Sequence, residues 1–376
     1  MNNTIFIAGS GGIGEAAALL LREWSDRDLT IILGDVSEAN LAKATDFVTS
    51  GSEKSSAVES VLVPREGESE EMRAAFERSD VLLDCSPGGQ APRMAAYAKE
   101  FRMHYANLTE YVAETDAILE LAKDAETGFV LQTGLAPGFI NVQAMALYRE
   151  FVSKFENEEV ERVAMKVGAL TAHAHDPHYY GFTWSPIGVA TEYVKDSRVI
   201  RDFKIGEQPA LSARETIVIG SRTYEADLTS GGAADLPDFF AGKARELEYK
   251  TLRYPDHYDW VESIIETLPK NEGMADRLQE MMMQAVPSVE DDIVVVHASV
   301  DGFDSNGRRR MLEKAYFVEP LVINGKRLRA IQTTTAGPLC QSAMLLLGGQ
   351  LKGVVLQSQI DPAEFMSGTF VANIYK

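Results

Sequence analysis

The sequence predicts an α/β protein in which a doubly wound domain carries an inserted, mixed α+β domain. Three observations predict this class. A glycine-rich turn follows a short apolar strand at the start of the chain. Strand-like and helix-like segments then alternate over about 135 residues, which is typical of a parallel sheet with right-handed crossovers. The middle of the chain alternates apolar and polar residues, as a half-covered antiparallel sheet does.

The glycine-rich turn lies in residues 4–14, which read TIFIAGSGGIG, and a helical run, EAAALLLREW, follows. In a G-x-G-x-x-G pattern the glycines allow a tight turn, a close approach of pyrophosphate to the backbone, and close packing of helix on sheet. The helix N-terminus adds N–H groups for the phosphates. This context predicts a Rossmann dinucleotide site rather than a glycine-rich turn without a cofactor. The predicted contacts in the turn are Gly9, Ser10, Gly11, Gly12, Ile13 and Gly14.

An acidic residue closes the second predicted strand, residues 29–35. Asp35 comes about twenty residues after the turn, where a carboxylate can bind the adenosine ribose hydroxyls. Val36, Ser37 and Glu38 follow it, and none of them offers a positive charge to a 2′-phosphate. The sequence therefore favours NAD over NADP.

Four further strands are predicted at 61–63, 80–85, 104–108 and 128–133. The predicted helices between the strands are 38–49, 70–78, 92–101 and 115–126, with Ser69 capping the second of them. Ligands of such sheets lie at the carboxyl ends of the strands. The predicted cofactor contacts at these ends are Cys85, Ser86, Pro87, Asn107, Leu108, Thr109 and Gly134. The alternatives are an ordinary loop at 86–89 and a helix cap at Thr109.

The pattern changes after residue 141. A helix is predicted at 142–155, β-rich runs follow, and helices are predicted at 236–241 and from 257 to about 286. From residue 333 a helix, a strand and a last helix are expected to return to the first domain. The predicted domains are therefore 1–141 with 334–376, a dinucleotide-binding domain, and 142–333, an inserted substrate and dimerisation domain.

The net charge, the cysteine count and the apolar content limit the partners and the cellular compartment that we expect for this protein. The chain has 376 residues and a formal net charge of −20, which disfavours nucleic acid or an anionic membrane as a partner. Two distant cysteines and the lack of any long apolar stretch favour a cytoplasmic enzyme. The run HAHDPH, with His173, His175 and His178, reads as a turn between strands, and no metal is expected.

Several motifs resemble those of the saccharopine dehydrogenase-like oxidoreductases. They are GSGGIG, TGLAPGFIN (133–141), GFTWSPIGVATEY (181–193), SGG (230–232) and YKTLRYPDH (249–257), in this order over nearly the whole chain. The family includes saccharopine reductases, carboxynorspermidine dehydrogenases and lysine 6-dehydrogenases. The resemblance implies hydride transfer between a nicotinamide cofactor and a C–N bond of an amino acid or amine derivative, through an imine. It also implies a homodimer formed through the inserted sheet.

Two positions depart from the saccharopine reductase pattern. Ile187 stands where those enzymes commonly carry an arginine after the W-S-P run, and Asp256 replaces a glycine in R-Y-P-G-H. Saccharopine itself is therefore not the expected substrate. The residues Glu192 and Tyr193, with the RVIRD run at 198–202, are closer to the carboxynorspermidine and lysine 6-dehydrogenase branches.

The chemistry that the resemblance implies needs a cation for a substrate carboxylate and a base for the amine proton. Arg253 and then Arg198 are the predicted carboxylate ligands, because a guanidinium binds carboxylate with two parallel hydrogen bonds. Glu110 and His257 are the predicted bases. Trp184 and Ser185 are expected to line the pocket. The alternatives are a surface ion pair for each arginine, a helix cap for Glu110, a solvated side chain for His257 and core packing for Trp184. For the whole protein, a carbonyl or hydroxy-acid oxidoreductase and a non-catalytic NAD(H)-binding sensor or scaffold remain open.

Overall fold

A computed structural model describes residues 3–376, and the chain divides into two compact units. The first unit comprises the chain up to Phe139 together with Leu321–Leu328 and Gln332–Tyr375. The second unit comprises Ile140–Pro320, Arg329–Ile331 and the last residue. Among residues 3–376, no helix combines the length and apolar character needed to cross a membrane.

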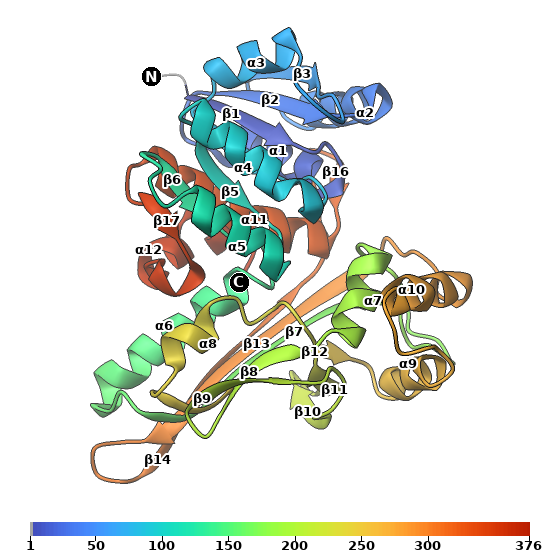
Figure 1. Ribbon diagram of the computed structural model, residues 1–376, viewed down its shortest axis with the longest axis vertical. Helices are drawn as coiled ribbons and strands as arrows, with labels where there is room; N and C mark the ends of the chain where they lie inside the picture. The colour runs from blue at the N-terminus through green and yellow to red at the C-terminus, as the bar shows by residue number, and fades with distance from the viewer. Residues whose placement is uncertain (1–2) are drawn as a thin grey trace. The chain divides into compact units, whose positions relative to one another are not determined.

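A seven-stranded parallel sheet forms the centre of the first unit, in the order β17-β6-β5-β4-β1-β2-β3 (Figure 1). The order reverses between β1 and β4, which makes this the switch point at which doubly wound sheets bind ligands. The strands are β1 (Asn3–Ala8), β2 (Leu29–Asp35), β3 (Ala57–Leu62), β4 (Val81–Asp84), β5 (His104–Asn107), β6 (Gly128–Val130) and β17 (Gly353–Val355), and a separate hairpin joins β15 (Leu321–Ile323) to β16 (Lys326–Leu328).

Helices cover both faces of this sheet, and α4 and α5 lie in front of it in Figure 1. The helices are α1 (Gly12–Trp24), α2 (Glu38–Ser50), α3 (Glu70–Glu77), α4 (Ala91–Glu100), α5 (Val112–Leu121), α11 (Ala330–Leu347), α12 (Pro362–Ser367) and α13 (Thr369–Ala372), with 3₁₀ turns η1 (Gly88–Gln90) and η2 (Gln357–Gln359). Phe76 of α3, Met94 of α4 and Ile118 of α5 share one core with the strands. Buried helix faces on both sides explain why β1, β2 and β4 are almost uniformly apolar.

The predicted fold class is confirmed, but several element bounds, among them those of β3 and α5, differ from the sequence prediction. β3 runs over Ala57–Leu62 rather than 61–63, because its polar residues lie in a strand at the sheet edge that is apolar only in part. α5 starts at Val112, so Tyr111 rather than Thr109 precedes it. The predicted Ser69 cap is confirmed, since its hydroxyl accepts a hydrogen bond from the Met72 N–H at 3.1 Å.

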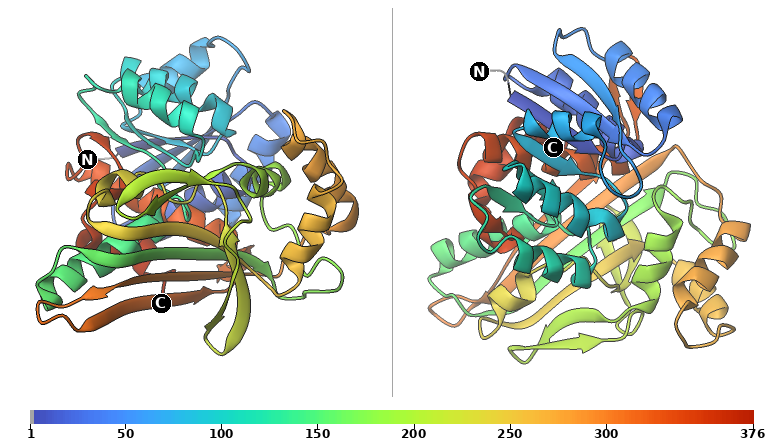
Figure 2. Two further views of the ribbon diagram at one scale, coloured as in Figure 1. Left: turned by 60° about the horizontal axis from the view of Figure 1, so that its bottom comes forward. Right: turned by 45° about the horizontal axis from the view of Figure 1, so that its top comes forward.

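The second unit is built on an eight-stranded sheet whose main path is β10-β11-β12-β7-β13-β14, with β8 and β9 added beside β12. β7 is parallel to β12 and antiparallel to β13. In Figure 2 the long orange strands β13 and β14 run side by side. The strands are β7 (Val160–Thr171), β8 (Ser197–Arg201), β9 (Lys204–Gln208), β10 (Glu215–Ile219), β11 (Arg222–Leu228), β12 (Ala244–Arg253), β13 (Asp292–Phe303) and β14 (Arg309–Val318).

Five helices accompany this sheet in the described part of the chain. They are α6 (Phe139–Phe155), α7 (Pro186–Val194), α8 (Leu236–Phe240), α9 (His257–Ile265) and α10 (Met274–Ala285). The predicted helical stretch from 257 to about 286 is therefore two helices separated by residues 266–273, and Gly273, just before α10, has a φ of +83° that suits glycine. Tyr193 of α7, Tyr258 of α9 and Met282 of α10 belong to one buried core. This core fixes the positions of the polar side chains described below.

Candidate active site

The glycine turn after β1 has the shape that a dinucleotide pyrophosphate requires. Gly9 has a φ of +93°, and a Cβ there would lie 2.7 Å from the Cys85 carbonyl oxygen. A Cβ on Gly14 would lie 1.9 Å from the Gly9 carbonyl oxygen, so the helix could not approach the turn. A Cβ on Gly11 would meet no atom within 4 Å, and no side chain caps α1. The open space beside an uncapped helix N-terminus fits a bound phosphate group.

Asp35 lies at the carboxyl end of β2, and its side chain is held by backbone N–H groups. One carboxylate oxygen accepts a hydrogen bond from the Ser10 N–H at 2.8 Å, and the other accepts one from the Ser37 N–H at 2.9 Å. Because Ser10 belongs to the glycine turn, this contact links the predicted ribose ligand to the predicted pyrophosphate site. The arrangement suits a ribose diol, which would donate its hydroxyl hydrogens to the carboxylate.

The end of β4 carries a buried carboxylate and a thiol. Asp84 accepts hydrogen bonds from the Ser86 hydroxyl and, at 2.8 Å, from the Tyr105 hydroxyl. Burial and the Asp84 charge raise the pKa of the Cys85 thiol, so it stays protonated and is a poor nucleophile. Pro87 leads into the 3₁₀ turn η1. These residues border the switch point, as the sequence analysis predicts for cofactor contacts.

Other predicted cofactor residues lie at the ends of β5 and β6. Asn107 is buried and its Oδ1 accepts a hydrogen bond from the Gln132 N–H at 2.8 Å. Leu108 and Thr109 follow it, and Glu110 comes next, partly exposed. The Gly134 N–H donates to the Pro137 carbonyl at 3.0 Å. The topology thus places the predicted residues past the strand ends, while Asn107 and Gly134 also hold the loops themselves in place.

Arg253, the predicted carboxylate ligand, is the last residue of β12 and is only 1% exposed. Its Nη2 donates to Glu192 Oε1 at 2.9 Å, its Nε donates to the Tyr193 hydroxyl at 2.5 Å, and its Nη1 donates to the Leu252 carbonyl at 3.0 Å. The guanidinium also lies over the Tyr180 ring, 4.8 Å from its centroid. The structure therefore pairs Arg253 with a carboxylate of the chain itself, which differs from the predicted pairing with substrate.

His257, one of the predicted bases, is completely buried at the start of α9. Its Nε2 lies 3.0 Å from the Tyr193 hydroxyl and its Nδ1 lies 2.6 Å from the His178 carbonyl oxygen. Burial, and then the Arg253 charge, lower the pKa of the His257 imidazole to about 3. The imidazole is therefore neutral near pH 7, and its Nδ1–H donates to the carbonyl.

Glu192 in α7 has no predicted role from its sequence, yet its carboxyl lies in this buried group. Burial raises the pKa of its carboxyl to about 7, although the Arg253 charge acts in the opposite direction. A carboxyl that changes its protonation state near neutral pH is suited to acid–base chemistry. The available signal was an acid at the end of the GFTWSPIGVATEY run, eight residues after a tryptophan.

Three other predicted side chains lie outside this buried group. Arg198 pairs with Asp238 through two hydrogen bonds of 2.9 and 3.1 Å, so it forms a surface ion pair. Ser185 is exposed and caps α7, accepting from the Gly188 N–H at 3.4 Å. Trp184 packs on Gly188, where a Cβ would lie 2.3 Å from the indole ring. Among residues 3–376, no group of three or more His, Cys, Asp or Glu side chains is placed to hold a metal.

The motifs of the middle of the chain converge on the buried group. The Asn141 side chain donates to the Gly232 carbonyl at 3.0 Å, and a Cβ on Gly232 would collide with the Tyr249 ring. The Ser230 N–H donates to the Glu192 carbonyl at 3.2 Å. Contacts between residues far apart in the sequence thus hold α7 against β12. This packing fixes the distance between Glu192 and Arg253.

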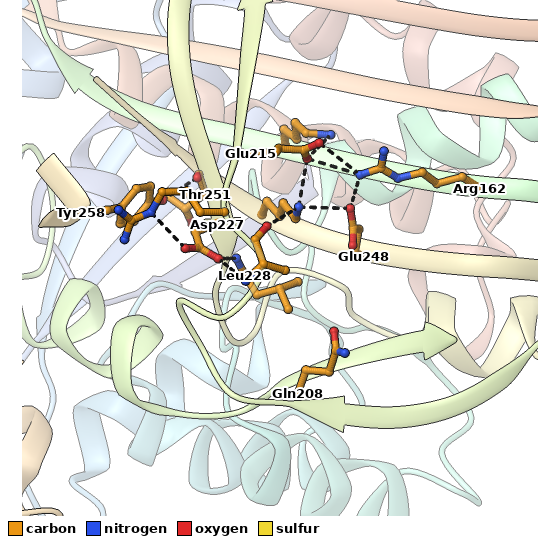
Figure 3. Close-up of polar contacts among 12 residues, drawn as sticks. Arg162, Gln208, Glu215, Asp227, Leu228, Glu248, Thr251 and Tyr258 are labelled. Carbon is orange, nitrogen blue, oxygen red and sulfur yellow. Dashed lines mark hydrogen bonds and ion pairs between the residues drawn. The ribbon is translucent and has the colours of Figure 1, made fainter. Parts of the chain in front are cut away.

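A second charged network lies on the opposite side of β12, because side chains alternate along a strand. Figure 3 shows Glu215 and Glu248 joined to Arg162, and Lys250 donates to Glu215 at 3.0 Å. Burial acts to raise the pKa of Glu248, but the charges of Arg162 and Lys250 lower it to about 2. These carboxylates are therefore ionised and paired, so the network is structural.

The chain matches two family models that together span most of its length. Residues 5–131 match the saccharopine dehydrogenase NADP binding domain, and residues 134–369 match the saccharopine dehydrogenase C-terminal domain. The chain belongs to the saccharopine dehydrogenase-like family. The predicted resemblance is confirmed, and with it an NAD(P)-binding oxidoreductase class with a nicotinamide cofactor.

Two solved structures share the fold of this family member. Apo saccharopine dehydrogenase (L-Glu forming) from Saccharomyces cerevisiae is 13% identical, with a TM-score of 0.75 over 99% of this chain and 98% of that one. Homospermidine synthase from Legionella pneumophila, solved in complex with NAD, is 11% identical, with a TM-score of 0.69 over 100% of this chain and 90% of that one. At these identities the likeness establishes the shared fold.

Proposed function

We propose that this saccharopine dehydrogenase-like protein transfers hydride between a nicotinamide dinucleotide and a C–N bond of an amino acid or amine adduct, through an imine. The observation that carries the proposal is the buried group of Glu192, Tyr193, Arg253 and His257, in which the Glu192 carboxyl has a pKa of about 7. Removal of hydride from a carbon that bears nitrogen requires an unprotonated amine. A carboxylate poised near neutral pH is suited to taking that proton.

Each residue of the buried group has a separate role in the proposed hydride transfer. Glu192 accepts the proton from the substrate ammonium, so that the nitrogen lone pair forms the C=N bond while the C–H bond breaks. Arg253 and Tyr193 hold the carboxyl and its surroundings in place. A dinucleotide whose pyrophosphate is bound at the glycine turn would supply the hydride acceptor through its nicotinamide ring, or the donor in the reverse direction. Glu110 remains a second predicted base.

A substrate panel combined with one variant tests this proposal. Oxidation of amines and amino acids, or reduction of imines, is expected, with the rate of amine oxidation rising with pH through about 7. Glu192→Gln should lower kcat by roughly 10²- to 10⁴-fold, the typical contribution of a general base, and remove that pH dependence. Turnover of only 2-oxo or hydroxy acids would contradict the C–N assignment. Binding of NADH without turnover of any substrate would favour a sensor or scaffold.

We propose NAD rather than NADP as the preferred dinucleotide. The Asp35 carboxylate and the following residues Val36, Ser37 and Glu38 support this choice, because a carboxylate repels a 2′-phosphate and accepts hydrogen bonds from a ribose diol. Dissociation constants for NADH and NADPH, measured by the fluorescence of the reduced ring, test it directly. Tighter binding of NADPH would contradict it.

We also propose a homodimer formed through the sheet of the second unit. Met311 and Phe317 of β14 are exposed by 58% and 43%, and their odd numbering places them on the same face of the strand. Large exposed apolar side chains on one face favour a protein interface. Sedimentation equilibrium should give twice the chain mass, and Phe317→Glu should shift the protein to monomer. A monomeric wild type would contradict the proposal.

A further inference from the structure

Helix α11 contacts the first turn of α1 through the buried side chain of Gln332. Gln332 is 5% exposed, and its Nε2 donates to the Gly12 carbonyl oxygen at 2.8 Å and lies 3.4 Å from Glu15 Oε1. Further along α11, the Cys340 thiol donates to the Ala17 carbonyl at 3.5 Å. Two separate contacts therefore join α11 to the first six residues of α1, although more than 300 residues separate them in sequence.

We infer that Gln332 is a positioning residue for the dinucleotide-binding turn. The inference rests on the proposed cofactor site at Gly9–Gly14. Gly12 opens α1, and its carbonyl belongs to the turn whose N–H groups would face the pyrophosphate. A hydrogen bond from a buried amide to that carbonyl fixes the orientation of the turn before any ligand binds. Preorganisation of this kind increases affinity, because less ordering is required on binding.

Gln332 has a second effect through Glu15. This carboxylate lies in the first turn of α1 and is only 8% exposed. A negative charge there stabilises the helix N-terminus, but it opposes the binding of a pyrophosphate at the same end. The Gln332 amide donates a hydrogen bond of 3.4 Å to this carboxylate. Loss of the amide would remove this hydrogen bond and its shielding of the Glu15 charge, which would weaken anion binding.

The test compares two glutamine variants of the same helix. Gln332→Leu removes the contact with α1. Gln341→Leu alters a glutamine of nearly equal burial whose Oε1 accepts from the Phe370 N–H, in another part of the unit. Titration with NADH should give a dissociation constant about tenfold higher for Gln332→Leu, as expected from one lost buried hydrogen bond. Gln341→Leu should stay within about twofold of wild type, even though both variants lose thermal stability.

Three further variants and measurements separate positioning from general destabilisation. Glu15→Gln should bind NADH more tightly than wild type, whereas Glu15→Gln combined with Gln332→Leu should recover only the part of the lost affinity that is due to the Glu15 charge. The isosteric Gln332→Glu should bind NADH more weakly than Gln332→Leu, with a loss that shrinks at high salt. In turnover assays of Gln332→Leu, the KM for the dinucleotide should rise while the KM for the amine stays constant.

The outcomes distinguish this inference from the proposed function. Equal NADH affinities for wild type, Gln332→Leu and Gln332→Glu would overturn the positioning role and leave the cofactor site intact. A matching loss in Gln341→Leu would assign the effect to stability and also overturn it. A wild type that binds neither NADH nor NADPH would overturn the proposed function, and the role of Gln332 with it.

Discussion

Glu192 and Arg253 form an ion pair of 2.9 Å in which both side chains are at least nine-tenths buried. One partner comes from α7 and the other from the end of β12, 61 residues later. Removing two charges from water is costly, and the attraction between them offsets the cost only when geometry and additional hydrogen bonds are good. Tyr193 supplies one such bond to Arg253. The pair therefore makes the site depend on correct packing of α7 against the sheet.

Arg253→Met should destabilise the protein strongly, because it leaves the Glu192 carboxyl buried without its cation. The expected loss is about 3–5 kcal/mol in the free energy of unfolding, measured by urea denaturation at pH 7.5. The matched control is Arg198→Met, which breaks a half-exposed pair with Asp238 and should cost less than about 1 kcal/mol. Similar losses for both variants would contradict the assignment of Arg253 to a buried pair.

The pH dependence of stability should reveal two opposing contributions between pH 5 and pH 6.5. The pKa of His257 is lowered to about 3, so the unfolded chain binds more protons there and stability falls as pH falls. The pKa of Glu192 is raised to about 7, so the folded chain binds more protons and stability falls as pH rises. In the wild type the two contributions cancel in part.

Single variants expose each contribution in turn. In Glu192→Gln the His257 effect remains, so stability should rise with pH by up to roughly 1.4 kcal/mol per pH unit. In His257→Gln the Glu192 effect remains, so stability should fall with pH by a comparable amount. Urea denaturation at pH 5.0, 5.5, 6.0 and 6.5 measures both slopes. Slopes of the same sign would show that one of the two pKa directions is wrong.

Two glycines of the turn should respond differently to alanine. Gly14→Ala places a Cβ 1.9 Å from the Gly9 carbonyl oxygen, so α1 must move away from the turn and the protein should lose several kcal/mol of stability, about 2–4. Gly11→Ala meets no protein atom within 4 Å and has an unstrained φ of −74°. It should fold normally but bind NADH at least about tenfold more weakly, because the methyl group occupies the space of the pyrophosphate.

The two variants should therefore separate stability, which Gly14→Ala lowers, from NADH affinity, which Gly11→Ala lowers. Melting temperature and NADH titration measure stability and affinity separately. Unchanged NADH affinity in a folded Gly11→Ala protein would place the dinucleotide elsewhere. Normal stability of Gly14→Ala would contradict the close approach of α1 to the turn.

Asp35→Asn should alter cofactor choice more than stability. The two carboxylate oxygens accept hydrogen bonds from the Ser10 and Ser37 N–H groups. Asparagine has only one side-chain oxygen, so one of these hydrogen bonds is lost together with the negative charge. We expect NADH to bind about tenfold more weakly, with NADPH affected less or bound more tightly, since repulsion of the 2′-phosphate is relieved. Titration with both reduced dinucleotides measures the ratio. A ratio that stays at the wild-type value would contradict the role of Asp35.

Much of the first unit could be predicted from sequence, because its determinants are local. Apolar runs such as 29–35 form buried parallel strands, and the spacing of Gly9, Gly11 and Gly14 requires a strand–turn–helix. The bounds of β3 and α5 could not be predicted. Their residues have weak periodicity, so packing at the sheet edge and around Tyr111 determines where each element begins.

The candidate site was predicted only in part. The sequence led to Arg253 and His257 through a motif, but it gave them roles on the assumption that they face a substrate. It did not assign Glu192 or Gln332 to the site, because neither an acid at the end of the GFTWSPIGVATEY run nor an amide at the start of α11 reveals from sequence alone which groups it will be buried against.

The sequence by itself determined the fold class, the glycine turn and the family, since each follows from patterns within short stretches of chain. Tertiary structure decided which charges are buried together. Burial and proximity shift a pKa or fix a hydrogen bond, and both depend on residues distant in sequence. Thus α7 brings Glu192 to Arg253, and α11 brings Gln332 to the turn that begins α1.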